Sequence, residues 1–467
     1  MIPLYNVAYS VIHHLENSDK PVFYIKDKTI TGNQFRNMSI NFALHMKKHG
    51  VTQDSCVALN TNNLIIATAF TVATGLIGAC WIKATVNAMK NSFFKITHFF
   101  DNSNVEFEGS IEPIIVDDGW FKVPDDYDDY NFSGYKSIFS PALITHSSGT
   151  TGDMKYMEVI YAGFYERANN NFEIQYENVE CVGFLFNPLK DTTQYKVMSL
   201  ILNDIPLIYD LKYEDIKRYP RLSILASHSQ INGFLRDKEP PDTPFNAILD
   251  VGGAASDIKF LEKMFKYFKE INIGYGSTEN GRTCNKRLYS ISDFNGSSGF
   301  PFPDVEFKFE NGAIFVKTPE YRTIRRYFGD PDDRIIEWYE SGDLGYMKDG
   351  ELYITGRSND RINIGGIKVD PKLIEDIVKT INGVTDCMVY QDTNLDILEQ
   401  MCIIVISDKD VSKQIYDRCV DGIGLAKTPK NIYYADELPI NENGKASRKL
   451  AVEAMKNKTP ISLTKYI

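Results

Sequence analysis

Short apolar runs alternate with helical patterns along the first half of the chain, and this alternation constrains the fold more than any other feature. The apolar runs cover residues 55–59, 64–82, 113–116 and 142–146. Such a rhythm is typical of βαβ units that build a largely parallel sheet. At 467 residues the chain also exceeds what one hydrophobic core usually organises, so we expect at least two domains.

The run at residues 64–82 carries no charge over 19 residues, which is close to the length that spans a bilayer. Its Thr and Gly residues make it only moderately apolar, and it is the one run of this kind in the sequence. We therefore favour a buried helix that passes into a strand of an α/β core, and we expect no membrane span.

Composition excludes several other classes of protein. Hydrophobic residues make up 43% and charged residues 24% of the chain, which are the proportions of a globular protein. The net charge of −11 is spread thinly, its densest acidic stretch (125–129) is predicted to be a solvated loop, and the scattered Lys and Arg form no patch for nucleic acid. The seven cysteines include no CxxC pair and the N-terminus lacks a signal-peptide pattern, so we expect reduced thiols and a cytoplasmic location.

Two predicted strands in the middle of the chain end in glycine-bearing turns. Residues 248–251 precede Gly252 and Gly253, and residues 271–273 precede Gly274. Because ligands gather at the carboxyl ends of parallel strands, these turns are candidates for a binding site. Between the strands we expect a helix that begins at Asp257 and turns five apolar residues to one face: Ile258, Leu261, Met264, Phe265 and Phe268.

After about residue 300 the pattern becomes antiparallel. Residues 302–309, 313–317 and 351–355 alternate, and Asn-Gly at 311–312 and Asp-Gly at 349–350 are strong hairpin turns. From residue 360 we expect a strand pair at 362–369, a helix opened by Asp370-Pro371, and strands at 387–390 and 402–406. The residues expected on the inner face of that helix are Leu373, Ile374, Ile377, Val378 and Ile381.

These patterns predict an α/β fold in two domains. Residues 1–358 form a large N-terminal domain of mostly parallel sheets and helices with an antiparallel β subdomain. Residues 359–467 form a small α+β C-terminal domain.

A loop of small residues directly follows the apolar run at 142–146. It consists of Ser147, Ser148, Gly149, Thr150, Thr151 and Gly152, with Lys155 three residues on. Glycines let backbone N–H groups approach a phosphate, the hydroxyls add donors, and the lysine adds a charge. It is not a Walker A motif, which needs GK followed by Ser or Thr. Taken alone, such a loop is more often a surface turn, and its weight comes from four later segments.

Five segments occur in a fixed order: SSGTTGDMK (147–155), GYGSTE (274–279), SGDLGYMKDGELYITGR (341–357), INIGGIKVDPKLIE (362–375) and LPINENGKASRK (438–449). Together they resemble the signatures of the AMP-forming adenylate synthetase superfamily, which contains acyl-CoA synthetases, peptide-synthetase adenylation domains and firefly luciferases. The segments extend over about two thirds of the chain. The resemblance implies that the protein uses ATP and Mg2+ and that the 147–155 loop binds phosphate.

The resemblance also assigns roles in the central segment. Glu279 is implied as the magnesium-associated residue, with Thr278 beside it in the catalytic group. Both offer the hard oxygens that suit phosphate-bound Mg2+. Tyr275 offers a face on which adenine could stack, and Gly253 and Gly276 are further nucleotide-binding positions.

In the later segments the resemblance places the ribose on Asp343 and sets Arg357 next to the nucleotide. Lys445 is implied to reach the active site from the C-terminal domain and to neutralise charge as a carboxylate attacks the α-phosphate. That domain is expected to be mobile about a hinge near Asn359, where the superfamily commonly has Asp or Lys. Met154 and Tyr156 are further departures, because the superfamily usually has Pro and Gly around the loop lysine.

The acid is expected near Asp191, Gly253 and Gly274. A carboxylate at Asp191 could accept the α-ammonium of an amino acid, or it could be an ordinary solvated loop residue. The next three side chains are polar, which argues weakly against a long fatty acyl tail; they are Thr192, Thr193 and Gln194.

The function expected from this resemblance is an ATP-dependent ligase. It would adenylate a small carboxylic or amino acid and then form a thioester with CoA or with a separate acyl carrier protein, since no carrier segment is expected after Lys449. From another class, the chain could be a non-catalytic nucleotide-binding scaffold of the same fold, and a luciferase-like oxidation of the adenylate is a more remote alternative.

Overall fold

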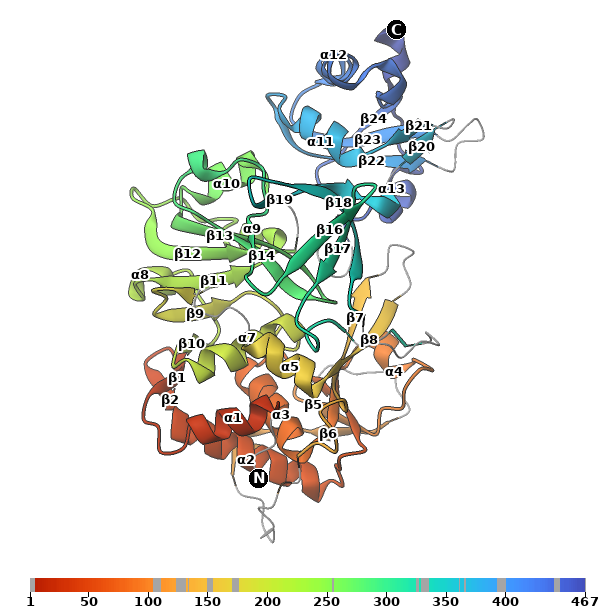
Figure 1. Ribbon diagram of the computed structural model, residues 1–467. Coiled ribbons are helices and arrows are strands. Elements are labelled where there is room, and N and C mark those ends of the chain that lie inside the picture. Colours follow the sequence, from red (N-terminus) through yellow and green to blue (C-terminus); the bar gives the residue numbers. More distant parts are fainter. Residues whose placement is uncertain are drawn as a thin grey trace. The chain divides into compact units, whose positions relative to one another are not determined.

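The computed structural model describes residues 5–103, 111–122, 132, 134–148, 154–169, 176–253, 256–324, 327–328, 336–360, 362–364, 367–392, 400–440 and 446–466 (Figure 1). The chain divides into two compact units, Met1–Glu306 with Val316–Tyr339, and Phe307–Phe315 with Glu340–Ile467. The second unit therefore includes most of the antiparallel strands that the sequence predicts between residues 302 and 358. The proposed boundary at residues 358/359 and the hinge near Asn359 stay predictions.

The first unit is built on a large sheet that is parallel in its interior. Its described strands follow the order β15-β14-β13-β12-β11-β9-β10-β1-β2, and the pairs from β13 to β1 whose register is defined are parallel, while β2, β14 and β15 are antiparallel. The bounds are β1 (Pro21–Ile25), β2 (Lys28–Thr31), β9 (Cys181–Phe184), β10 (Leu207–Ile208), β11 (Leu222–Ala226), β12 (Phe245–Val251), β13 (Phe268–Ser277), β14 (Gly281–Leu288) and β15 (Phe300–Pro301).

A second sheet in this unit has the order β6-β5-β3-β4-β7-β8 and is parallel except for the β7–β8 pair. Its strands are β3 (Cys56–Asn60), β4 (Cys80–Lys83), β5 (His98–Asp101), β6 (Pro113–Ile115), β7 (Pro141–Ser148) and β8 (Met154–Ile160). The acidic loop predicted at residues 125–129 lies outside the described residues.

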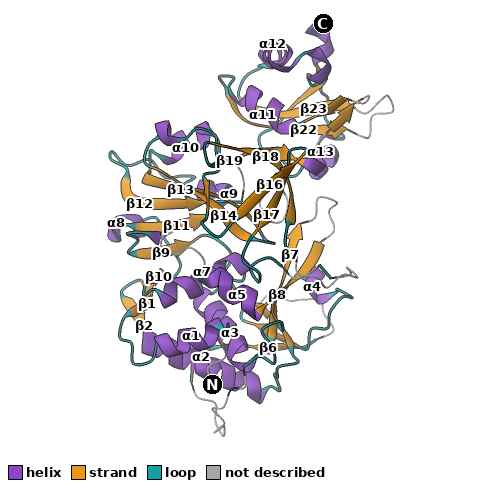
Figure 2. Cartoon of the chain, viewed as in Figure 1, coloured by secondary structure: helices purple, strands orange, loops and turns teal. Residues whose placement is uncertain are grey.

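Helices α1 (Val7–His14), α2 (Gly32–Lys48), α3 (Leu64–Ile77), α5 (Tyr161–Ala168) and α7 (Asp191–Leu202) contribute to one hydrophobic core with strands of both sheets. Figure 2 draws these helices in purple and the strands in orange. The other described helices of the unit are α4 (Val86–Met89), α8 (Asp215–Arg218), α9 (His228–Phe234) and α10 (Ile258–Met264), with short 3-10 turns at Asp118–Phe121 and Ile291–Asp293. The predicted α/β fold with largely parallel sheets is confirmed.

The uncharged run at residues 64–82 forms helix α3 followed by strand β4, as predicted. Every residue of α3 is buried, Asn63 caps its N-terminus, and Gly78 ends it with a left-handed φ of +87°. A Cβ at Gly78 would meet the backbone of Gly134, so only glycine fits there. None of the helices in the described ranges is long and apolar enough to cross a membrane.

The predicted elements in the middle of the chain need two corrections. Asp257 caps α10 as expected, but Ile258 is 55% exposed and Phe268 already belongs to β13, because the helix ends at Met264. Strand β13 also runs past Gly274 to Ser277, since β14 pairs with it on the far side. Gly274 therefore lies inside a strand rather than at its end.

The second unit begins with the antiparallel sheet β16-β17-β18-β19, of which β16 (Glu306–Glu310) and β17 (Ala313–Lys317) form one hairpin and β18 (Tyr339–Lys348) and β19 (Glu351–Arg357) another. Both predicted turns are present, with positive φ at Asn311, Gly312, Asp349 and Gly350. The remaining elements form an α+β arrangement. These are β20 (Ile362–Ile364), β21 (Ile367–Val369), α11 (Pro371–Lys379), β22 (Val384–Asp392), β23 (Gln400–Ser407), α12 (Ser412–Ile423), β24 (Asn431–Tyr434), α13 (Arg448–Met455) and β25 (Ile461–Ser462), with 3-10 turns at Ser358–Asp360, Leu425–Lys427 and Leu463–Tyr466.

Helix α11 begins as predicted, with Asp370 as its cap and Pro371 at its first position. Ile374 and Val378 are buried, but Leu373 is 47% exposed, so its expected place on the inner face is wrong. Ile377 packs against the same core, and Ile381 is buried just after the helix ends at Lys379.

Candidate active site

The candidate phosphate loop joins two antiparallel strands. Ser147 and Ser148 end β7, and Ser147 pairs in register with Lys155 of β8. Gly149, Thr150, Thr151 and Gly152 lie outside the described residues, as do the side chains of both serines. The departure at Tyr156 has a packing explanation: its ring is buried and meets Phe94 edge to face, with 5.2 Å between the ring centroids.

Tyr327 brings together two of the predicted site residues, Lys155 and Glu279. Its hydroxyl donates to Glu279 Oε1 at 2.9 Å, and Lys155 Nζ lies 5.6 Å from the centroid of its ring. A second phenol, that of Tyr339, is 2.9 Å from the Tyr327 hydroxyl. Burial first, and then the charge of Glu279, raise the pKa of the Tyr339 hydroxyl. The loop lysine and the predicted magnesium-associated carboxylate therefore share one aromatic neighbour.

Two buried arginines fix the backbone that carries Thr278 and Glu279. Arg167 of α5 donates from Nη1 to the Thr278 carbonyl at 3.0 Å and from Nη2 to the Glu279 carbonyl at 2.6 Å. Its Nε donates to the carbonyl of Arg322 at 2.9 Å. Arg322 in turn donates to the carbonyl of Asn280 at 3.1 Å, and burial lowers the pKa of its guanidinium to about 10. These bonds hold the β13–β14 turn in one conformation.

The predicted glycine positions lie close together at the ends of β12 and β13. Gly253 has a φ of +85°, which favours glycine, and follows the last residue of β12 by two positions. A Cβ at Gly276 would come within 2.2 Å of the Gly281 carbonyl oxygen, so the narrow turn requires glycine there. Tyr275 is half-buried between Gly274 and Gly276, and its carbonyl accepts from Thr283 Oγ1 at 3.1 Å.

In the second unit, Asp343 and Arg357 face one another across β18 and β19. They are register partners, and Arg357 Nε donates to Asp343 Oδ1 at 3.0 Å. Asp343 is buried, whereas the Arg357 side chain is 53% exposed. The sequence placed both residues at the nucleotide, and the structure makes them direct neighbours.

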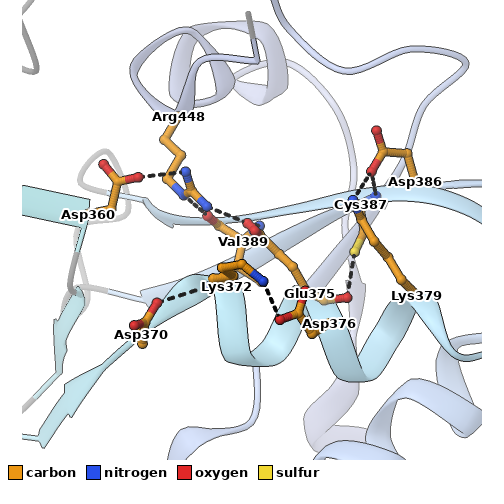
Figure 3. A network of polar contacts seen from close by, with 10 residues as sticks. All are labelled: Asp360, Asp370, Lys372, Glu375, Asp376, Lys379, Asp386, Cys387, Val389 and Arg448. Carbon is orange, nitrogen blue, oxygen red and sulfur yellow. Dashed lines mark hydrogen bonds and ion pairs between the residues drawn. The ribbon is translucent and has the colours of Figure 1, made fainter. Parts of the chain in front are cut away.

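Lys445 lies outside the described residues, but the segment after it is firmly held. Arg448 donates from Nη1 to Asp360 Oδ2 at 2.8 Å, from Nη2 to Glu375 Oε1 at 2.6 Å and from Nε to the Val389 carbonyl at 2.9 Å (Figure 3). Burial raises the pKa of the Glu375 carboxyl although Arg448 opposes the shift. Asp360 directly follows Asn359, whose side chain is not described. The Arg448 guanidinium therefore links the residue next to the predicted hinge with the segment that follows Lys445.

Asp191 is the first residue of α7 and is buried rather than solvated. Its Oδ1 accepts from Thr192 Oγ1 at 3.4 Å, while Oδ2 has no hydrogen-bond partner in the described ranges. A carboxylate in the first turn of a helix is favoured by the helix dipole. The interpretation as a solvated loop residue is therefore wrong, and a role in binding an ammonium group remains a hypothesis.

Comparisons of sequence and of structure agree on the kind of protein that the chain resembles. No protein-family model matches the chain. The chain is 26% identical over 258 residues to a long-chain-fatty-acid–CoA ligase of Yersinia pestis, covering 50% of this chain and 45% of that protein. It is 29% identical over 183 residues to the 2-succinylbenzoate–CoA ligase of Lactococcus lactis, covering 38% and 40%. The aligned part thus spans less than half the length of these curated relatives.

Solved structures match over nearly the whole chain. The o-succinylbenzoate CoA synthetase MenE of Bacillus subtilis, in complex with its acyl-adenylate intermediate, has a TM-score of 0.80 at 18% identity and covers 95% of this chain and 97% of its own. ATP-bound MatB of Rhodopseudomonas palustris has a TM-score of 0.80 at 16% identity, with 97% and 99% covered. These relatives and the shared fold agree with a resemblance of the chain to the AMP-forming adenylate synthetase superfamily. The motif-based resemblance is confirmed.

The donors around Glu279 fit the magnesium role that the superfamily implies. Mg2+ commonly binds through one or two carboxylates together with phosphate oxygens and water. Glu279 supplies a buried carboxylate whose Oε1 is oriented by Tyr327. Among the described residues no group of three or more His, Cys, Asp or Glu could hold an ion by itself. A single oriented carboxylate fits an ion that phosphate oxygens and water also hold.

Sequence reasoning missed Tyr327, Arg167 and Arg322. None of the three belongs to the five segments that resemble the superfamily. Arg167 and Arg322 are buried, at 5% and 1% exposure, and long charged side chains are almost never buried without a partner. Their spacing in the sequence gives no sign of this, because the carbonyls that they bind come from other segments.

Proposed function

We propose that this protein is an ATP-dependent ligase that activates a carboxylic acid as its acyl adenylate and transfers the acyl group to a thiol. The observation that carries the proposal is the link from Lys155 through Tyr327 to Glu279, which joins a loop cation to a buried carboxylate at the carboxyl end of β13. Superfamily relatives named as CoA ligases support the reaction class, and complexes of MenE and MatB with ATP support the nucleotide.

The first step joins acid and nucleotide. A carboxylate oxygen forms a bond to the α-phosphorus of ATP, the bond to the bridging oxygen breaks, and pyrophosphate leaves with the electron pair. Lys155 and Lys445 offset the charge that builds up on the phosphates. Mg2+, when bound with the nucleotide, supplies further neutralisation of phosphate charge near Glu279. In the second unit, Asp343 is proposed to accept hydrogen bonds from the ribose hydroxyls, with Arg357 holding its orientation.

The second step releases AMP. The thiol sulfur forms a bond to the acyl carbon, the bond from that carbon to the phosphate oxygen breaks, AMP leaves with the electron pair, and the thiol proton goes to solvent. We propose CoA as the acceptor because the relatives are CoA ligases, and a free-standing carrier protein is the alternative acceptor. A rotation about Asn359 between the two steps would let one site serve both reactions. A cytoplasmic location is also part of the proposal, supported by seven free thiols.

Pyrophosphate release tests the proposal. The purified chain is incubated with ATP, Mg2+ and a panel of acids that includes amino acids, aryl acids, dicarboxylates and short to long fatty acids, with and without CoA. Release that depends on an acid, together with CoA consumption, supports the ligase. Lys445→Ala should lose adenylate formation while keeping ATP binding and thermal stability. ATP binding without release for any acid would instead support a nucleotide-binding scaffold, and light emission would point to oxidation of the adenylate.

A further inference from the structure

A buried charged cluster lies between α7 and the ends of β12 and β14, outside the groups used above. Arg282 Nη1 donates to both oxygens of Asp250, at 2.6 and 2.8 Å. Lys196 Nζ of α7 is 3.5 Å from Asp250 Oδ2. The side chains are 12%, 5% and 11% exposed for Arg282, Asp250 and Lys196. Two cations thus share one carboxylate in a region that is almost closed to water.

One edge of the Arg282 guanidinium is left without an acceptor. Nε and Nη2 are both buried and have no hydrogen-bond partner among the residues that the structure describes, whereas Nη1 is saturated by Asp250. Nε and Nη2 form the flat side of the guanidinium, whose two parallel N–H groups match the two oxygens of a carboxylate. Leaving such charged donors buried and unpaired destabilises the folded protein. The geometry therefore favours a second anion on this edge.

Neighbouring groups add to the excess of positive charge and to the number of unsatisfied polar atoms. After burial, the groups that influence the Lys196 amine are Asp250, Arg282 and Lys190, of which only Asp250 is an anion. Asn272, the register partner of Asp250 on β13, is fully buried, and within the described part of the chain neither its Oδ1 nor its Nδ2 has a partner. Polar groups with this much unmet bonding capacity are typical of a site that a polar ligand completes.

The unpaired edge lies against the predicted acid site. A Cβ at Gly274 would come within 2.1 Å of Arg282 Nε, so the guanidinium occupies the space that a side chain at Gly274 would fill. Gly252 also lies beside Gly274, since a Cβ at Gly252 would be 3.9 Å from the Gly274 carbonyl oxygen. The cluster is therefore next to Gly274, one of the positions at which the sequence places the acid, and Gly253 directly follows Gly252 in the chain.

We infer that the acid activated by this protein carries a second carboxylate, which binds the Nε–Nη2 edge of Arg282 with Lys196 beside it. This inference rests on the proposed ligase function and narrows its substrate to dicarboxylic acids. The depressed pKa of Lys196, brought to about 8 by burial and then by Arg282, agrees with a cation that lacks sufficient counter-charge. A fatty acid tail would leave the edge unpaired, and an amino acid would place an ammonium group in a region that already has excess positive charge.

The test compares acids that differ only in the distal carboxylate. Pyrophosphate release is measured with butanoate against butanedioate and with hexanoate against hexanedioate, and each acid is also titrated without ATP by its effect on the melting temperature. The variants are Lys196→Met, which keeps the Arg282–Asp250 pair, and Arg282→Gln. Arg218→Gln is the control, because Arg218 is a surface arginine of the same unit that pairs with the exposed Asp27.

We expect kcat/KM for the dicarboxylate to exceed that for the matched monocarboxylate by about tenfold or more, the discrimination that one charged hydrogen bond provides. Lys196→Met and Arg282→Gln should reduce that ratio by about tenfold, and Arg218→Gln should leave it unchanged. Better turnover of monocarboxylates or amino acids would overturn the inference. If no acid releases pyrophosphate, the ligase function fails, and the inference is then decided by whether dicarboxylates raise the melting temperature of the wild type but not of Lys196→Met.

Discussion

Arg448 and Glu375 form an ion pair with 2.6 Å between Nη2 and Oε1, and the Glu375 side chain is only 14% exposed (Figure 3). The same Glu375 oxygen accepts from the Val389 backbone N–H at 2.9 Å. Arg448 lies three residues after Lys445, and its other N–H groups hold Asp360 and the Val389 carbonyl. The pair therefore ties the residues that follow Lys445 to helix α11, and the same guanidinium also ties them to Asp360.

Replacing Arg448 by Met should impair positioning of Lys445. The change leaves the buried Glu375 carboxylate without its cation, so we expect a loss of about 2–4 kcal/mol in stability. Because a small displacement of a catalytic group is costly, adenylate formation should fall by about tenfold to a hundredfold, with ATP affinity little changed. Arg448→Lys should restore part of kcat. Lys413→Met, which removes an exposed pair with Asp417, is the control. Normal kcat in Arg448→Met would contradict a positioning role.

Tyr327→Phe should separate the two contacts that Tyr327 makes. The phenylalanine keeps the ring near Lys155 but cannot donate to Glu279 Oε1. We expect the apparent affinity for Mg2+-ATP to fall about fivefold, the effect of about 1 kcal/mol from one hydrogen bond. Magnesium titrations of pyrophosphate release measure this. Tyr346→Phe, at an exposed tyrosine of the second unit, should leave the titration unchanged. Equal titrations for the Tyr327 variant and the wild type would show that the hydroxyl does not orient Glu279.

Arg167→Met should be among the most damaging single substitutions in the first unit. It removes three donors to the carbonyls of Thr278, Glu279 and Arg322, all in a buried region. Each carbonyl left unsatisfied costs about 1–3 kcal/mol, so the melting temperature should fall by several degrees and turnover with it. Arg218→Gln, on the surface, should melt within about one degree of the wild type. A variant at Arg167 with wild-type melting would mean that water replaces the lost bonds.

The sequence predicted the architecture well where periodicity and turn chemistry agree with the fold. The order of β3, α3 and β4 follows from two apolar runs, at residues 55–59 and 64–82, and the Asn311-Gly312 and Asp349-Gly350 turns follow from their need for positive φ. It failed for Phe268, which continues an apolar spacing from α10 although β13 has already begun. A spacing pattern cannot show where a chain leaves the helix to pair with a distant strand.

The candidate site was predictable only where a residue acts within its own segment. Asp343 and Arg357 share one hairpin and one motif, and they do pair. Tyr327, Arg167 and Arg282 contribute through contacts with distant segments, for example 32 positions away for Arg282 with Asp250 and 112 positions away for Arg167 with Glu279. Lys196 has no motif around it, and its significance appears only once burial and the shared carboxylate are known.

The titration of Lys196 gives a prediction that does not depend on catalysis. Its pKa is lowered from 10.5 to about 8 in the folded protein, first by burial. Below pH 8 both the folded and the unfolded chain carry the proton, and the full cost of the buried charge is present. Between pH 8 and 10.5 the folded chain releases the proton first, so the unfolded chain binds more protons and stability rises with pH.

The measurement is the stability of the wild type relative to Lys196→Met at pH 7, 8, 9 and 10. Taking the difference between the two free energies of unfolding removes the contribution of the buried tyrosines and cysteines, which titrate in both proteins. We expect the free energy of unfolding of the wild type, relative to that of Lys196→Met, to rise above pH 8, by up to about 3 kcal/mol at pH 10. A difference that stays constant from pH 7 to 10 would mean that the amine keeps its ordinary pKa, which requires a counter-ion or water beside it. A dicarboxylate added at pH 7 should also remove most of the difference, because it supplies the missing anion to Arg282 and Lys196.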